Sequence, residues 1–169
     1  MMGRILLIVV LCGCLAACSK SDTPLPGAIS PQQLAADTVL IRSYINSSNA
    51  TGFLPDVSNG VATGVYYKID TLGTGNALFT SSTLVTVGYQ GSVMGSSTIF
   101  AQTSNFHPSF SYGQMILGWQ YGIRHIKTGG TVRLLIPSGY AYGPYPQSTL
   151  GLPANAILDF TIKLYNISN

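Results

Sequence analysis

The stretch RLLIPSGYAYGPYPQSTLGLPANAILDFTIKL, residues 133–164, decides the fold that this chain is expected to adopt. Apolar and polar residues alternate through its last part, and one face is made up of Ala156, Leu158, Phe160, Ile162 and Leu164. The same alternation begins just before the stretch, at Val132, Leu134 and Ile136. Because side chains in a strand point alternately to the two faces, a period of two indicates a strand with one buried face. The stretch therefore predicts two strands joined by a loop rich in aromatic residues and proline.

Three further strands are predicted upstream, over residues 65–71, 84–89 and 97–100. A short helix is predicted between them and the final pair, over MILGWQYGI, residues 115–123. Its apolar face is made up of Ile116, Trp119 and Ile123. Gly118 and Gly122 flank this face and would let the helix lie close to a sheet. Several strands with one short helix indicate an α+β domain in which a sheet wraps around the helix.

A longer helix is predicted near the start of the chain, from Ser30 to about Asn46. Ser30 is suited to cap it, Pro31 suits the first helical position, and Gln33 completes a capping box. Its apolar side consists of Leu34, Thr38, Ile41, Tyr44 and Ile45. This side would pack on the main domain or on the same helix of a second copy. We expect a monomer, with a dimer through this helix as the alternative.

Charged residues are scarce, at 8% of the 169 residues, while 46% are hydrophobic and 19 are glycine. Such a composition is typical of a compact β-rich domain with a neutral polar surface. The formal net charge of +3 is too small for the basic surface that nucleic-acid binding needs. We therefore expect no nucleic-acid partner.

The first residues read as a lipoprotein signal peptide, residues 1–17, followed by a flexible tether over 18–29. The apolar run is only about seven residues long, far below the roughly 20 that a spanning helix needs. The residues LAAC end at Cys18 and resemble the bacterial lipobox, in which this cysteine receives lipid and becomes the mature N-terminus. The sequence thus predicts a protein of the bacterial cell envelope, anchored to a membrane through Cys18. The alternative is an ordinary secretory signal with a chance cysteine.

The sequence offers few residues suited to covalent catalysis, metal binding or nucleotide binding. His107 and His125 lack a second ligand at metal spacing, and the chain contains no glutamate. Four of the five aspartates are expected at the surface or in the tether, namely Asp22, Asp37, Asp56 and Asp70. We expect neither a metal nor a cofactor.

Four motifs occur in a distinctive order: VGYQG (87–91), FSYGQMILGW (110–119), IKTGGTVRLLIPSGYAYG (126–143) and LPANAILDFTIKL (152–164). Together they resemble the FKBP-type peptidyl-prolyl cis-trans isomerase family, and the resemblance covers about residues 65–167. In that family an antiparallel sheet of about five strands forms a half-barrel around one short helix.

The resemblance implies an isomerase domain over residues 63–169, preceded by a helical N-terminal extension over 30–62. It also implies a shallow apolar pocket for a proline side chain. The residues carried over are Trp119 as floor, Tyr89, Phe100 and Phe160 as walls, Phe110 as a further lining residue, Met115 and Ile116 at the rim, Leu152 on the overhanging loop, and Tyr142, whose hydroxyl would reach the bound peptide. The Ile116 backbone N–H would bond a substrate carbonyl.

Such a pocket needs no nucleophile, because rotation about an X–Pro bond breaks no covalent bond. The implied function is isomerisation of proline-containing polypeptides, assisting the folding of exported proteins. The chain departs from the family at Ala101, where family members usually carry aspartate, and in the loop over 143–151, which is about a residue longer. Ala101 raises an alternative, a binding module or chaperone that holds proline segments without accelerating their rotation.

Overall fold

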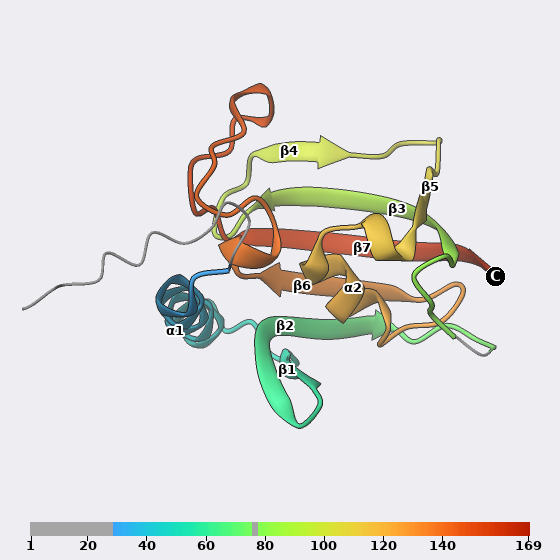
Figure 1. Ribbon diagram of the computed structural model, residues 1–169, viewed down its shortest axis with the longest axis horizontal. Coiled ribbons are helices and arrows are strands. Elements are labelled where there is room, and N and C mark those ends of the chain that lie inside the picture. Colours follow the sequence, from blue (N-terminus) through green and yellow to red (C-terminus); the bar gives the residue numbers. More distant parts are fainter. Residues whose placement is uncertain (1–28, 76–77) are drawn as a thin grey trace, which may run out of the picture.

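A seven-stranded antiparallel sheet forms the body of the protein (Figure 1). The computed structural model describes residues 29–75 and 78–169. The strand order is β1-β2-β6-β7-β3-β4, and β5 pairs with β3. The strands are β1 (Leu54–Ser58), β2 (Val61–Thr71), β3 (Leu84–Val93), β4 (Ile99–Gln102), β5 (Ser109–Ser111), β6 (Thr131–Ile136) and β7 (Leu158–Ser168). The helices are α1 (Pro31–Ser47) and α2 (Leu117–Ile123), with short 3-10 turns η1 (Tyr112–Gln114), η2 (Ser138–Tyr140) and η3 (Ser148–Leu150).

The predicted α+β class is confirmed, with an antiparallel sheet, a short helix against it and a helix at the N-terminal side. Each of the five predicted strands is present, as β2, β3, β4, β6 and β7. The sheet has two strands more than expected, β1 and β5. Both are short, with five and three residues, so neither presents a long alternating pattern.

The hairpin of β1 and β2 means that α1 accounts for only part of the extension expected over 30–62. Asn59 and Gly60 join the two strands, and both have positive φ, 51° and 78°. Two such residues make the tight turn whose twist suits a hairpin, and Asn-Gly is its strongest sequence signal. The chain therefore enters the sheet at Leu54, soon after α1 ends at Ser47.

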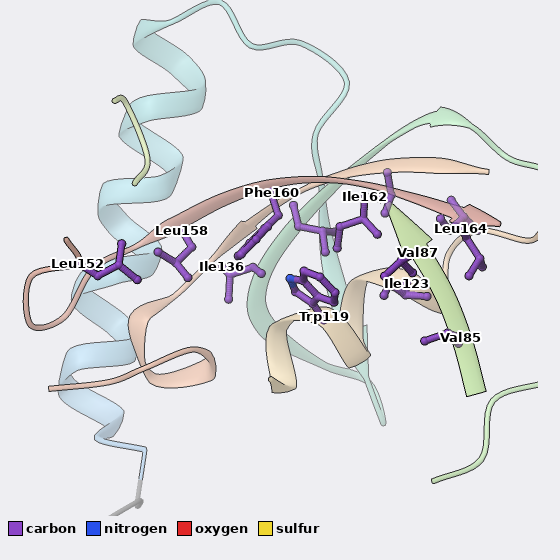
Figure 2. Close-up of a cluster of buried hydrophobic side chains, with 14 residues drawn as sticks. Val85, Val87, Trp119, Ile123, Ile136, Leu152, Leu158, Phe160, Ile162 and Leu164 are labelled. Carbon is purple, nitrogen blue, oxygen red and sulfur yellow. The ribbon is translucent and has the colours of Figure 1, made fainter. Parts of the chain in front are cut away.

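Helix α2 lies against the inner face of the sheet, where Trp119 and Ile123 join the main buried cluster (Figure 2). A Cβ on Gly118 would overlap Ile136, and a Cβ on Gly122 would overlap Leu134. The two glycines thus allow the close approach of α2 to β6 that their spacing predicts. This approach sets the height of Trp119 above the sheet.

Helix α1 lies against the outer face, near the end of the sheet where β6 ends and β7 begins (Figure 1). Its fully buried Ile41 packs with Leu135 and Ile157. Leu135 points away from its neighbours on β6, which face α2, because side chains alternate along a strand. Ser30 caps the helix as predicted, its hydroxyl oxygen accepting from the Gln33 backbone N–H at 3.3 Å. Part of the apolar side of this helix thus packs on the chain's own domain.

Asp37 and Asp56 are fully buried, so their expected place at the surface is wrong. Each is surrounded by hydrogen-bond donors from distant parts of the chain, which compensate for the loss of water around the carboxylate. Asp70 is exposed, as predicted, and pairs with Lys68 at 3.3 Å. Asp22 lies outside the described residues.

Asp56 ties β1 to the C-terminal end of α2. Its two oxygens accept from Arg124 Nη2 at 2.8 and 3.0 Å, from His125 Nε2 at 2.6 Å, and from Thr63 Oγ1 at 2.9 Å. Burial alone would raise the pKa of Asp56, but these hydrogen bonds outweigh burial and hold the pKa below its ordinary value. The Tyr67 ring, from β2, stacks on the His125 ring with centroids 3.7 Å apart and adds a contact between the sheet and the end of α2.

The expected signal peptide, the lipidated Cys18 and the tether up to residue 28 lie outside the described residues. Among residues 29–75 and 78–169, neither helix has the length and apolar character needed to cross a bilayer.

Candidate functional site

A cavity of about 250 Å³ opens on the inner face of the sheet, between the strands and α2. It collects side chains from segments far apart in the sequence. Its lining residues are Tyr89, Phe100, Ala101, Phe110, Gln114, Met115, Ile116, Trp119, Tyr142 and Phe160. Every predicted pocket residue except Leu152 therefore meets in one hollow. Ala101 and Gln114 line it as well, although no sequence signal had pointed to Gln114.

Trp119 is the centre of the aromatic group that shapes this cavity. It is 7% exposed, and its ring stands nearly perpendicular to Phe160 at 5.2 Å and to Phe110 at 6.2 Å. Tyr89 meets it at 5.0 Å, also edge to face. Phe100 packs edge to face on Phe160 at 5.5 Å. Edge-to-face pairs hold rings in defined orientations, so the walls support one another.

Gly91 makes room for one of these walls. It lies opposite Phe160 in the pairing of β3 with β7, and a Cβ at this position would overlap the Phe160 ring. The glycine of the VGYQG motif thus lets the ring lie across β3 toward Phe100. No other residue type leaves that space empty.

The segment before α2 is held to the helix by two side-chain hydrogen bonds. Gln120 Nε2 donates to the Met115 carbonyl at 2.8 Å, and the Tyr112 hydroxyl donates to the Gln120 carbonyl at 2.5 Å. Ile116 precedes the helix in an extended conformation, and its carbonyl accepts from the Trp119 N–H at 3.0 Å. Its own N–H has no acceptor among the described residues. This N–H is therefore available at the cavity rim for an external carbonyl. Tyr112 and Gln120 were not assigned from sequence, since helix periodicity shows a face but not a side-chain bond.

Tyr142 brings a hydroxyl group to the cavity. Burial raises its pKa above the ordinary value of about 10, and the neighbouring Tyr89 raises it further. The group therefore remains a protonated phenol at neutral pH. It can donate a hydrogen bond to a carbonyl oxygen in the cavity.

Trp119 also contains a buried donor. Its indole Nε1 is covered by protein and has no hydrogen-bond partner among the described residues. An unpaired buried N–H is unfavourable by about 1–3 kcal/mol.

Leu152 is the one predicted pocket residue that the structure places elsewhere. It is 3% exposed and belongs to the buried cluster, where Figure 2 shows it at one end, apart from Trp119. The backbone N–H groups of Gln147 and Leu152 each donate to the other residue's carbonyl, at 2.9 and 3.1 Å. This short turn closes the loop and directs Leu152 into the core. No residue from 143 to 151 lines the cavity, so the lengthened loop does not fill it.

The cavity carries no charge. Its lining consists of apolar and aromatic side chains together with the amide of Gln114 and the hydroxyls of two tyrosines. Within the described parts of the chain, no three His, Cys, Asp or Glu side chains gather as metal ligands. The arrangement suits a neutral, ring-sized apolar group whose neighbouring carbonyls take hydrogen bonds at the rim.

Comparison with known proteins gives one consistent result. The family described as FKBP-type peptidyl-prolyl cis-trans isomerase matches residues 75–165. The chain is 36% identical over 109 residues to the FKBP-type peptidyl-prolyl cis-trans isomerase FkpA of Buchnera aphidicola from Schizaphis graminum, covering 64% of this chain and 42% of that protein. The chain thus spans less than half the length of the curated relatives it matches.

Two solved structures share the fold. A peptidyl-prolyl cis-trans isomerase from Pseudomonas syringae superposes with a TM-score of 0.64 at 26% identity, covering 84% of this chain and 99% of that one. FkpA from Escherichia coli superposes with a TM-score of 0.63 at 28% identity, covering 81% of this chain and 62% of that one. The match to the Pseudomonas structure extends over nearly its whole length.

Proposed function

Since this chain belongs to the FKBP-type peptidyl-prolyl cis-trans isomerase family, we propose that it catalyses rotation about X–Pro peptide bonds in its aromatic cavity. The observation that carries the proposal is the convergence of Tyr89, Trp119, Tyr142 and Phe160 on one uncharged hollow. The proline ring would lie against Trp119. The carbonyls beside it would accept from the Ile116 N–H and the Tyr142 hydroxyl.

The energetics of the peptide bond explain why such a hollow is sufficient. Rotation faces a barrier of about 18–20 kcal/mol because the C–N bond has partial double-bond character. The twisted transition state has lost this resonance, so its carbonyl is less polar than that of the planar ground state. An apolar cavity therefore disfavours the planar form more than the twisted form. This is differential binding, in which each 1.36 kcal/mol gives a tenfold change in rate.

Removing the phenol should reveal the contribution of Tyr142. We expect Tyr142→Phe to lower kcat/KM for a proline-containing peptide about 2- to 10-fold, because one hydrogen bond contributes about 0.5–1.5 kcal/mol. The assay is proline-limited refolding of a substrate protein, or isomerisation of a short peptide. Tyr145→Phe is the matched control, since Tyr145 lies in the neighbouring loop and is 52% exposed. Equal loss in both variants would contradict the role given to Tyr142.

A second candidate function is binding of proline segments without acceleration, and Ala101 is the observation that favours it. Ala101 lines the cavity at the position where family members usually carry aspartate. A carboxylate there would supply a charge-assisted hydrogen bond of about 1.5–3 kcal/mol. The two functions separate cleanly: a protein that binds an X–Pro peptide by NMR titration yet leaves the refolding rate unchanged is a binding module.

We also propose that the protein works at a membrane of the bacterial cell envelope, held by lipid on Cys18, where it assists the folding of exported proteins. The proposal rests on the LAAC residues that end at Cys18 and on the short apolar run before them. Cells grown with labelled palmitate should incorporate the label into the protein, and Cys18→Ala should abolish incorporation. Label retained in that variant would remove the anchor from the proposal.

A further inference from the structure

Asp37 in α1 has a fully buried carboxylate that makes no ion pair with any described residue. One oxygen accepts from the backbone N–H of Ser138 at 2.8 Å and from the Ser138 hydroxyl at 2.6 Å. The other accepts from Gln33 Nε2 at 2.7 Å. Two of the three hydrogen bonds to this carboxylate therefore come from one serine, 101 positions further along the chain.

Ser138 is the first residue of η2, the short turn that follows β6 and leads to Tyr142. The N–H groups in the first turn of a helical segment have no partner inside that segment. Asp37 supplies the missing acceptor from another element, as a capping residue would.

The carbonyl of the same serine holds both neighbours of Tyr142. It accepts from the Ala141 N–H at 3.0 Å and from the Gly143 N–H at 2.8 Å. Ser138 is thus fixed by Asp37 through its N–H and hydroxyl, and its carbonyl fixes the residues on either side of the tyrosine. Two steps of hydrogen bonding connect a carboxylate on the outer helix to the phenol in the cavity.

Helix α1 packs closely on the sheet, and this packing fixes the position of the Asp37 carboxylate. Gly64 in β2 lies under the helix, where a Cβ would stand 2.8 Å from Thr38 Oγ1 and 3.1 Å from Leu34. Ile41, one turn after Asp37, is fully buried against the sheet. The helix lies before residue 75, where the match to the isomerase family begins.

We propose that Asp37 is a positioning residue, through which the N-terminal helix sets the place of the Tyr142 hydroxyl in the cavity. The inference rests on the proposed function and deepens it. The helix outside the family match then adjusts the site rather than only covering the sheet.

A double-mutant cycle on the full chain tests this inference. We expect Asp37→Ala to lower kcat/KM about 2- to 10-fold, no more than Tyr142→Phe does, with partial recovery in Asp37→Asn, which keeps one acceptor oxygen. In the Tyr142→Phe background, Asp37→Ala should have no further effect, because residues that act through one group are not additive. Losses that multiply would show a general structural effect and overturn the proposal. Asp70→Ala is the control, since its carboxylate is exposed.

NMR supplies a readout that does not depend on turnover. The amide hydrogens of Ala141 and Gly143 should exchange faster in Asp37→Ala than in the wild type. The amide hydrogens of β7 should exchange at the same rate in both proteins. If the wild type has no isomerase activity, the proposed function fails, and the cycle is repeated with peptide affinity in place of kcat/KM. If Asp37→Ala does not fold, Ser138→Ala, which removes only the hydroxyl donor, is used for the same cycle. Unchanged exchange at Ala141 and Gly143 would overturn the proposal in either variant.

Discussion

Trp119→Ala is expected to lower the isomerase kcat/KM by about 30-fold or more, while Ile123→Ala leaves kcat/KM of the folded protein unchanged. Trp119 forms the floor of the cavity and meets Tyr89, Phe110 and Phe160 edge to face. Truncating a buried aromatic anchor of a binding site costs about 2 kcal/mol or more. At 1.36 kcal/mol for each factor of ten, this loss corresponds to about 30-fold.

Ile123 makes this comparison sharp, because it lies one turn further along α2 and is fully buried but does not line the cavity. Both substitutions remove core volume, and each should lower the free energy of unfolding by about 2–5 kcal/mol. Urea denaturation measures that loss, and kcat/KM is then measured under conditions where circular dichroism shows both variants folded. Equal falls in kcat/KM would mean that Trp119 acts through stability alone.

Asp56→Asn is expected to lower the free energy of unfolding by about 3–5 kcal/mol, the usual effect of breaking a buried ion pair by removing one partner. The asparagine would present an N–H₂ group to donors that need an acceptor, Arg124, His125 and Thr63. Asp70→Asn is the matched control. Its pair with Lys68 is 40% exposed on both sides, so the loss should be below about 1 kcal/mol.

The same carboxylate should make the stability of the wild type depend on acidity. The pKa of Asp56 is lowered in the folded protein, so the unfolded chain binds the proton more readily. The stabilisation is therefore complete above the unfolded pKa of about 3.9 and is lost as the pH falls through the folded pKa below it. Denaturation measured from pH 7 down to pH 2 should show a smaller acid loss in Asp56→Asn than in the wild type. Parallel curves for the two proteins would contradict the assignment.

Regular patterns made much of this architecture predictable. The alternation of Leu158, Phe160 and Ile162 predicts β7, and Ser30 with Pro31 predicts the start of α1. Gly118 and Gly122 predict the close packing of α2, because small residues on one helical face serve mainly to admit a neighbour. Each of these signals is local, so the chain around it is sufficient to interpret it.

Features that depend on distant partners were not predictable in this way. Asp37 and Asp56 are buried because Ser138 and Arg124 reach them from elements 101 and 68 positions away. An aspartate alone gives no sign of such a partner, and its ordinary place is the surface. The β1 hairpin is different, since the Asn-Gly pair at its turn is a local signal that sequence reasoning did not use.

The pocket residues were predicted from the resemblance. Periodicity alone assigns Tyr89 and Phe160 to the buried face of a strand and does not distinguish a pocket residue from a core residue. Eight of the nine residues carried over by motif line the cavity, among them Tyr142 in the turn after η2 and Met115 and Ile116 just before α2. The transfer misplaced Leu152, because the turn between Gln147 and Leu152 reverses the loop and sends that side chain into the core. Loop conformation depends on such turns, which a motif match does not resolve.

The strand order has a consequence for biosynthesis. β7 follows every other strand in sequence, yet it lies between β6 and β3 and joins the two halves of the sheet. A nascent chain whose β7 is still inside the ribosomal tunnel has two separate sheet fragments, each with an open edge toward the missing strand. The domain can therefore complete its folding only after synthesis of this strand, and until then its apolar faces and strand edges stay open to association with other chains.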